Sequence, residues 1–369
     1  MAQKHLEVDQ QLYTCFIDYS KAFDRVHHYQ LIECLEKIGV DGKDIRVITQ
    51  LYWHQKAAIR INDELSPYTA IKRGVRQGCV LSPYLFNIYT EFIFRESNEM
   101  PGVCIHGMNV NNLRYADDTA LIANDPQNLQ NIVNKVKDES SKAGLDMNVK
   151  KTKTMVISRH TEESNLQIIV DGIPLEMVDV FKYLGTLIKD NGKTDTEIQA
   201  RTNLAKAQFS AMSKTFTSKR LKMSTKIRIL KCYIFSIFTY GSEAWTLSKV
   251  LEQKIEAFEM YCYRRMGNVS WKEKVTNESV LKKIKCKRSL LKDVQKRKLR
   301  YYGHIKRRNN ILTTAMEGRM NGKRPRGRPR INWFSDVKEW TSLPAAECTR
   351  MAASRSLWSV TTSRHPQRR

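Results

Sequence analysis

The sequence predicts an α+β protein in which a mixed region of short strands and helices is followed by an all-helical, strongly basic region. Up to about residue 190, apolar runs typical of strands are interspersed with helical patterns, whereas from Lys193 onward the apolar residues recur at helical spacing. The charge changes at the same place: residues 1–190 contain 22 Lys and Arg against 25 Asp and Glu, and residues 191–369 contain 41 against 13. An excess this large is typical of a surface that binds a polyanion, and nucleic acid is the first candidate.

Other partners and compartments are less well supported by the composition. No apolar stretch reaches the roughly 20 residues that a membrane-spanning helix needs, so we expect no membrane partner. The eight cysteines are scattered and no Cys-x-x-Cys pair occurs, which argues against a zinc knuckle or a redox motif. The polar segment Met1–Gln11 lacks the apolar core of a secretory signal. We therefore expect an intracellular protein, nuclear or cytoplasmic, with the nucleus favoured.

The elements of the first half follow from local patterns. The apolar run 12–18 ends on Asp18 and predicts a buried strand with a carboxylate at its end. A helix that Gly39 can end, an amphipathic helix over 42–54 and a hairpin of 57–61 and 68–72 should follow. The loop 73–83 then leads through Ser82 and Pro83, good N-cap and N1 residues, into a buried apolar helix.

The next segment, 110–124, predicts an acidic hairpin around Asp117 and Asp118. Adjacent carboxylates between apolar residues are costly unless a cation accompanies them, although an Asp-Asp pair can also be a solvated hairpin tip. Together with Asp18, three carboxylates from two β-elements could hold two Mg²⁺ ions and promote phosphoryl transfer. Because successive side chains of a strand face opposite ways, we expect Asp18 and Asp117 to be the principal ligands and Asp118 a weaker one. A helix should start at Asp125-Pro126 and end at Gly144, and further strands should lie within 153–185.

Five segments, in this order, resemble motifs of reverse transcriptases of the LINE-type, non-LTR retrotransposon family. Phe16–Asp24 (FIDYSKAFD), Arg76–Asn87 (RQGCVLSPYLFN) and Tyr115–Asp118 (YADD) resemble motifs A, B and C. Leu145–Thr152 (LDMNVKKT) resembles motif D, and Tyr183–Gly185 (YLG) resembles the primer-grip motif. The resemblance implies a polymerase palm, an antiparallel sheet packed on helices, over residues 1–190. It also implies a helical thumb over 191–270, a basic helical and extended nucleic-acid-binding region over 271–341, and we expect a flexible tail over 342–369.

The resemblance implies an RNA-directed DNA polymerase that uses two Mg²⁺ ions, or Mn²⁺, with dNTPs, an RNA template and a DNA primer, in an element that integrates its DNA copy. The aspartates of motifs A and C would bind the metal ions, and Lys151 would be a proton donor to pyrophosphate, unless it is a solvated lysine at a strand edge. Phe23 would be the gate that rejects a 2′-hydroxyl, unless it is only a core residue. The nucleotide would also contact three further residues: Tyr19, Gln77 and Gly78.

Two further features concern whether this chain can act as a polymerase and where it contacts nucleic acid. Only 17 residues precede Asp18, so we expect the fingers region that grips the triphosphate in this family, and the accompanying endonuclease, to be missing. The alternative function is thus a catalytically incompetent retroelement relic that binds nucleic acid through residues 191–369. The proline-rich segment 323–330 should be extended and contact nucleic acid, as an AT-hook core or as a basic linker or nuclear-import signal. Its arginines are Arg324, Arg326, Arg328 and Arg330.

Overall fold

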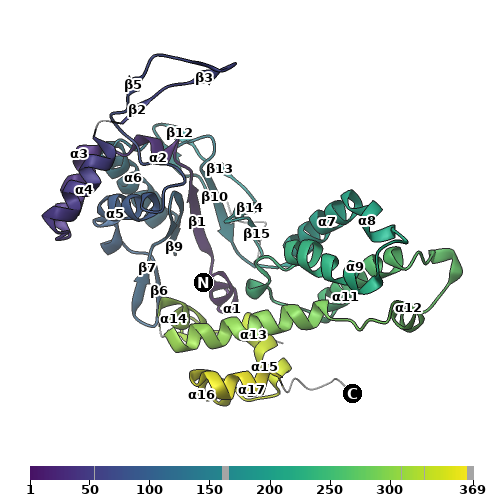
Figure 1. The fold of residues 1–369 in the computed structure, drawn as a ribbon. Coiled ribbons are helices and arrows are strands. Elements are labelled where there is room, and N and C mark those ends of the chain that lie inside the picture. The colour runs from purple at the N-terminus through teal and green to yellow at the C-terminus, as the bar shows by residue number, and fades with distance from the viewer. Residues whose placement is uncertain (54, 160–165, 309, 328, 364–369) are drawn as a thin grey trace. The chain divides into compact units, whose positions relative to one another are not determined.

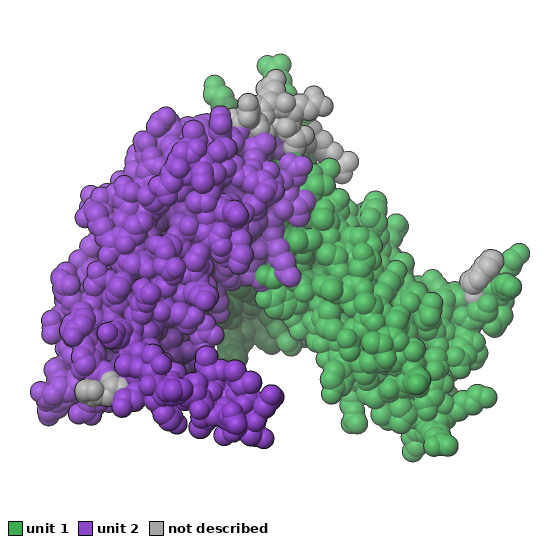
Figure 2. Space-filling view, turned by 90° about the horizontal axis from the view of Figure 1, so that it is seen from above, with its two compact units in different colours: residues 1, 3, 185–369 green, residues 2, 4–184 purple. Residues whose placement is uncertain are grey.

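The computed structural model describes residues 1–53, 55–159, 166–308, 310–327 and 329–363 (Figure 1). The chain consists of two compact units, coloured separately in Figure 2, with the boundary between Leu184 and Gly185. The N-terminal unit comprises residues 2 and 4–184, and the C-terminal unit comprises residues 1, 3 and 185–369. In the part of the chain that is described, no helix combines the length and the apolar character needed to cross a membrane. The predicted α+β class is confirmed.

The N-terminal unit is built on a five-stranded sheet with the order β13-β10-β1-β9-β8. The central strand, β1 (Leu12–Ile17), is buried along nearly its whole length, as its continuous apolar run predicts. It pairs antiparallel with β10 (Lys153–Ile157) on one side and β9 (Asp118–Ala123) on the other. The edge strands are β8 (Asn112–Tyr115), antiparallel to β9, and β13 (Glu176–Met177), parallel to β10.

Helices cover this sheet and close its core. The helix α6 (Pro126–Lys142) starts where predicted, because the Asp125 side chain accepts a hydrogen bond from the Asn128 N–H. Its fully buried face lies over β1 and β9. That face consists of Leu129, Ile132, Val133 and Val136. The other helices of the unit are α1 (Ala2–Glu7), α2 (Ala22–Arg25), α3 (His28–Lys37), α4 (Gly42–Tyr52) and the buried α5 (Ser82–Phe94).

The predicted hairpin after α4 is present as an exposed ribbon. Asn62 and Asp63 both have positive φ, as a two-residue type I′ turn requires, and neither is glycine. The ribbon consists of β2 (Lys56–Ala57) paired with β5 (Thr69–Ala70) and β3 (Arg60–Ile61) paired with β4 (Glu64–Leu65). The remaining strands are β6 (Val103–Ile105), β7 (Met108–Val110), β11 (Ile169–Val170), β12 (Ile173–Pro174) and β14 (Val180–Tyr183).

The C-terminal unit is helical around a second core, apart from the short strand β15 (Thr186–Lys189). The segment between α9 and α10, Leu230–Phe235, is a π-helical stretch. The helices are α7 (Asp195–Ala211), α8 (Ser213–Thr217), α9 (Met223–Ile229), α10 (Ser236–Phe238), α11 (Lys249–Met266), α12 (Asn277–Ile284), α13 (Leu290–Arg308), α14 (Ile311–Glu317), α15 (Trp333–Thr341), α16 (Ala345–Ala353) and α17 (Arg355–Ser363).

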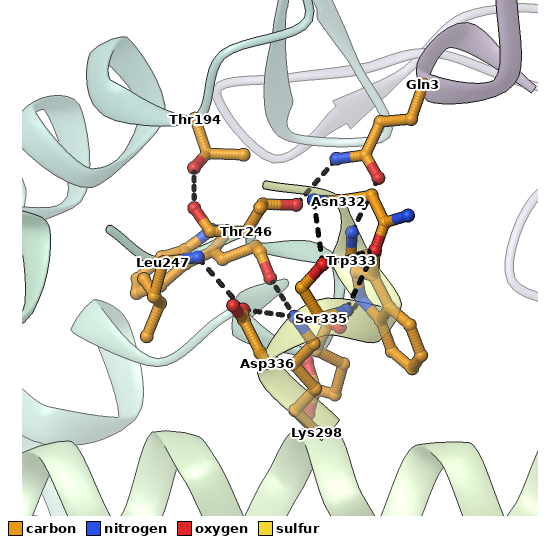
Figure 3. Close-up of polar contacts among 11 residues, drawn as sticks. Gln3, Thr194, Thr246, Leu247, Lys298, Asn332, Trp333, Ser335 and Asp336 are labelled. Atoms are coloured by element: carbon orange, nitrogen blue, oxygen red, sulfur yellow. Dashed lines mark hydrogen bonds and ion pairs between the residues drawn. The ribbon is translucent and has the colours of Figure 1, made fainter. Parts of the chain in front are cut away.

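A buried ion pair lies at the centre of the C-terminal unit (Figure 3). The Lys298 ammonium, on α13, donates to the Asp336 carboxylate at 2.6 Å and to the Trp245 carbonyl at 2.7 Å. The same carboxylate accepts from the Leu247 N–H at 2.9 Å, and the ammonium lies 4.6 Å from the centroid of the Trp333 ring. Both charged side chains are almost completely buried, so each offsets part of the desolvation of the other.

The division of the C-terminal region differs from our expectation. The predicted thumb, basic region and tail share one core, to which Phe258, Leu299 and Trp358 all contribute. Residues 342–363 are not a flexible tail, because α16 and α17 pack on α13 and Trp358 is only 3% exposed. Residues 364–369 of that predicted tail lie outside the described residues.

Candidate active site

The acidic hairpin forms between β8 and β9. Tyr115 pairs with Asp118, so the two-residue turn consists of Ala116 and Asp117. Ala116 has a φ of 54°, in the left-handed region that residues other than glycine adopt at a cost of about 1–2 kcal/mol. Asp117 therefore lies in the turn and Asp118 is the first residue of β9, which makes their environments different.

Asp18 lies beside this hairpin because of the strand register. The last pair between β1 and β9 is Ile17 with Thr119, and one residue further along each strand are Asp18 and Asp118. Burial raises the pKa of Asp118, and the negative charges of Asp117 and Asp18 raise it further. Asp118 is thus close enough to both Asp117 and Asp18 for their charges to act on it.

The loop after α6 holds the end of β1 and brings Lys151 to Asp18. The Asn148 N–H donates to the Asp18 carbonyl at 2.8 Å, and the Asp18 N–H donates to Thr152 Oγ1 at 3.3 Å. Lys151 Nζ lies 3.9 Å from Asp18 Oδ2. Both side chains are substantially exposed, so the ammonium is free to move toward a bound ligand.

Phe23 lies under the loop 73–83 with one face of its ring covered. It stacks on Phe86 of α5, with ring centroids 4.5 Å apart and planes inclined by 12°. The loop is tied to the Phe23 backbone, because the Val75 N–H donates to the Phe23 carbonyl at 2.7 Å. The ring is partly buried and firmly positioned, which fits both a structural role and a gate.

Gly74 is a structurally constrained residue beside the site that the sequence reasoning missed. Its φ is 100°, and a Cβ at this position would lie 3.0 Å from the Cα and the carbonyl oxygen of Asp24. Only glycine allows this close approach of two backbone segments. Gly78, which the motif singled out, also has a positive φ of 83°, but a Cβ there would meet no atom within 4 Å, and its neighbour Gln77 is exposed. From the sequence alone, nothing distinguishes the glycine that packs against another segment from the one that does not, since both lie in the same polar loop.

The Tyr19 side chain does not face the acidic hairpin. It is buried, and its hydroxyl forms a hydrogen bond of 2.9 Å with Ser140 of α6. Its backbone pairs with Met147. The ring of Tyr19 is part of the core. The nucleotide contact predicted for this residue could therefore involve only its backbone.

Tyr183 of the primer-grip motif supports the hairpin through a hydrogen bond to its backbone. Its hydroxyl donates to the Asp118 carbonyl at 3.3 Å, and its ring lies 5.7 Å from that of Phe16 on β1. Burial, and secondarily the charge of Asp118, raises the pKa of Tyr183 to about 12, so the phenol remains a donor. The sequence motif indicated this residue but not its contact with Asp118.

The donor set of the site suits a hard divalent cation. Within the described residues, no three His, Cys, Asp or Glu side chains come together closely enough to hold a metal ion by themselves. Mg²⁺ does not need such a cage, since it is usually bound by one or two carboxylates, waters and substrate phosphates. Burial, followed by repulsion from Asp117 and Asp18, raises the pKa of Asp118, and a bound cation would offset both effects.

In the basic segment 323–330, the described residues 323–327 and 329–330 belong to no helix or strand, and the chain bends at Arg326 and Gly327 instead of running straight as predicted. Arg324 and Arg326 are exposed, whereas Arg330 donates to the Asn191 carbonyl at 2.6 Å and is partly buried. The predicted contact residue Arg328 lies outside the described residues. This geometry is equally compatible with a DNA contact and with a solvated linker.

Comparisons with known proteins agree with these features. The family model "Reverse transcriptase (RNA-dependent DNA polymerase)" matches residues 2–188, about half of the chain. A putative uncharacterized transposon-derived protein of Caenorhabditis elegans is 30% identical over 246 residues, which cover 64% of this chain and 86% of that protein. The Pol polyprotein of the type-1 retrotransposable element R2 of Nasonia vitripennis is 24% identical and covers 62% of this chain, but only 22% of the polyprotein is matched.

Two further proteins match a larger part of the chain at lower identity. The probable RNA-directed DNA polymerase from transposon X-element of Drosophila melanogaster is 22% identical over 84% of this chain and 34% of its own length. The structure of apo telomerase from Candida tropicalis is 15% identical, with a TM-score of 0.41, over 83% of this chain and 52% of that chain. The chain thus spans about a third or less of the two retrotransposon proteins from Nasonia and Drosophila. With a family model matching half its length, the chain belongs to the reverse transcriptase family, and its predicted resemblance to the enzymes of non-LTR retrotransposons is confirmed.

Proposed function

We propose that this chain carries the polymerase centre of a non-LTR retrotransposon reverse transcriptase, which copies an RNA template by adding nucleotides from dNTPs to the 3′-hydroxyl of a DNA primer. The observation that supports this most directly is the register of β1 and β9, which brings Asp18 next to Asp118. Asp117 in the adjoining turn and Lys151, 3.9 Å from Asp18, complete a set of groups suited to phosphoryl transfer.

The aspartates would hold divalent cations, the cofactors with which this family works. Two Mg²⁺ ions, or Mn²⁺, would activate the attacking hydroxyl and offset the charge that develops on the transferred and leaving phosphates. Asp18 and Asp118 are held at the ends of paired strands, so their carboxylates are positioned before a ligand arrives. Asp117 is held by a turn whose geometry fixes it beside Asp118.

The other residues would position the nucleotide and handle its proton. Lys151 is within reach of the phosphates that Asp18 would face, and its ammonium can donate a proton to the leaving pyrophosphate. The Phe23 ring, backed by Phe86, would stand against the sugar and exclude a 2′-hydroxyl. Gly78 leaves its backbone uncovered, so the loop can approach a nucleotide closely.

Primer extension on an RNA template tests this proposal. The purified chain should extend a DNA primer with dNTPs and Mg²⁺, and Asp117→Ala should abolish the extension. Asp24→Asn is the matched control, because Asp24 is an exposed carboxylate close in sequence to Asp18, and it should retain most of the activity. Extension no greater than that of Asp117→Ala would contradict the proposal and favour a chain that only binds nucleic acid.

A further inference from the structure

A groove lined by residues of α13 and α17, the helices so labelled in Figure 1, lies in the C-terminal unit, outside the palm motifs. Its volume is about 870 Å³, and the two helices that form its walls contact each other directly. Its basic lining residues are Lys296, Arg297, Arg300, His304, Arg307 and Arg355. Besides these, hydroxyl groups of α17 and the rings of Tyr301 and Trp358 line the groove.

The basic residues of α13 form one continuous face. Lys296, Arg300, His304 and Arg307 follow one another at intervals of four, four and three residues, which places them on the same side of the helix. With a rise of about 1.5 Å per residue, this face extends over about 16 Å. A linear polyanion lying along the groove would therefore meet the positive groups of Lys296, Arg300 and Arg307 on one side of the helix.

Little of this charge is neutralised within the chain. Glu243 is the single acidic residue lining the groove in the described part of the structure, and it already pairs with Arg297 at 3.2 Å. Within the same described residues, no ion pair forms at Lys296, Arg300 or Arg355. Such a surplus in a concave site concentrates anions there.

The wall formed by α17 is held in place by specific packing. The Trp358 indole lies against α13 at Gly303, where a Cβ would come within 2.7 Å of Trp358 Nε1. The same indole donates to the Leu299 carbonyl at 2.8 Å, and Arg307 donates to the Ala352 carbonyl at 3.1 Å. The groove is therefore a defined feature of the fold and not a gap between loosely attached helices.

We propose that this groove binds the sugar-phosphate backbone of single-stranded nucleic acid, independently of the polymerase centre. A positive groove with an accessible aromatic ring, here that of the partly exposed Tyr301, is an arrangement by which proteins bind single strands without reading sequence. The volume is within the range of sites that bury most of a small-molecule ligand, which suits a few nucleotides of one strand. The hydroxyl of Ser359 on α17 provides a polar group for the strand on the opposite wall.

Binding of a labelled 15-nucleotide RNA to the full chain, followed by fluorescence anisotropy, tests the proposal. EDTA is present and dNTPs are omitted, so polymerisation cannot contribute to the signal. Lys296→Ala/Arg300→Ala should weaken binding about tenfold at moderate salt and lower the slope of log affinity against log salt by about 1.4, since each lost phosphate contact removes about 0.7. Lys283→Ala/Lys338→Ala, which removes the same charge at exposed positions outside the groove, should change both quantities much less.

Three results would overturn the proposal. The groove variant could lose no more affinity than the control variant, which would assign binding to net charge alone. An RNA duplex could compete as well as the single strand, or an acidic peptide of equal charge could compete as well as RNA. Because none of these measurements uses the aspartates or Mg²⁺, a chain that fails in primer extension can still confirm the groove, and the loss of the groove leaves the primer-extension test unaffected.

Discussion

Replacing Gly74 with alanine should destabilise the palm by about 2–4 kcal/mol. A residue with a side chain held at positive φ costs about 1–2 kcal/mol, and the new Cβ would lie 3.0 Å from the backbone of Asp24, closer than the roughly 3.5–4.0 Å of carbon atoms in contact. Relief of that contact requires the loop to move away. The movement would weaken the hydrogen bonds from Gly74 to Val26 and from Val75 to Phe23, now 2.8 and 2.7 Å long, each worth about 1 kcal/mol.

Gly78→Ala is the matched control for this prediction. It imposes a similar backbone strain at a φ of 83°, but its Cβ meets no other atom, so it should cost only about 1–2 kcal/mol. Hydrogen exchange read by mass spectrometry in increasing urea measures the loss in peptides covering residues 12–26, separately from the C-terminal unit. If Gly74→Ala costs no more than Gly78→Ala, the close approach to Asp24 contributes nothing and the reasoning fails.

Three further predictions concern two lysines, one buried and one exposed. Lys298→Met should destabilise the C-terminal unit by about 3–5 kcal/mol because it leaves Asp336 buried without its cation, and Lys298→Met/Asp336→Leu should recover much of this loss. Urea unfolding followed by tryptophan fluorescence measures both variants, since five of the six tryptophans lie beyond residue 184, and equal losses would contradict the pairing. Burial lowers the pKa of Lys298 from 10.5 to about 8, although Asp336 opposes the shift. Between these two pH values the unfolded chain keeps a proton that the folded chain has released. Stability should therefore rise with pH between about 8 and 10.5, and Lys298→Met should remove the rise. Lys151→Ala should slow primer extension about 100-fold or more if its ammonium protonates pyrophosphate, whereas the exposed neighbour Lys150→Ala should change the rate little.

The sequence predicted those parts of the palm that depend on local pattern. The strand ending at Asp18, the hairpin at Asp117 and the helix starting after Asp125 each follow from a run of neighbouring residues. That these elements surround one site was predicted from the resemblance of five motifs in order, not from any local pattern. Antiparallel pairing of β1 with β9 then brings Asp18 and Asp118 together across a separation of 100 residues, which no local pattern specifies.

The features that were missed depend on contacts between distant segments. The need for glycine at position 74 arises from the backbone of Asp24, and the role of Tyr183 arises from the carbonyl of Asp118. Similarly, Tyr19 lies within a recognised motif, but only the position of Ser140 on α6 shows that its ring faces the core. Periodicity within a segment carries no information about these partners.

The folded tail shows the same limit in the C-terminal unit. Residues 342–363 have weak apolar periodicity because α17 is anchored largely by one side chain, that of Trp358. Its binding surface on α13 depends on the absence of a side chain at Gly303, 55 residues earlier. A glycine inside a basic helix would ordinarily be read as a weak point of the helix, whereas here it accommodates an indole ring.

The uneven charge of the chain suggests that its two regions have different roles. Residues 1–190 have three more acidic than basic residues, so the region that would perform phosphoryl transfer does not by itself attract a polyanion. Residues 191–369 have 28 more basic than acidic residues and contain the groove between α13 and α17. Attraction of nucleic acid and catalysis would then depend on different residues and respond differently to salt. Raising the salt concentration should weaken template binding steeply, because phosphate contacts release counterions, while the rate with saturating template should change far less.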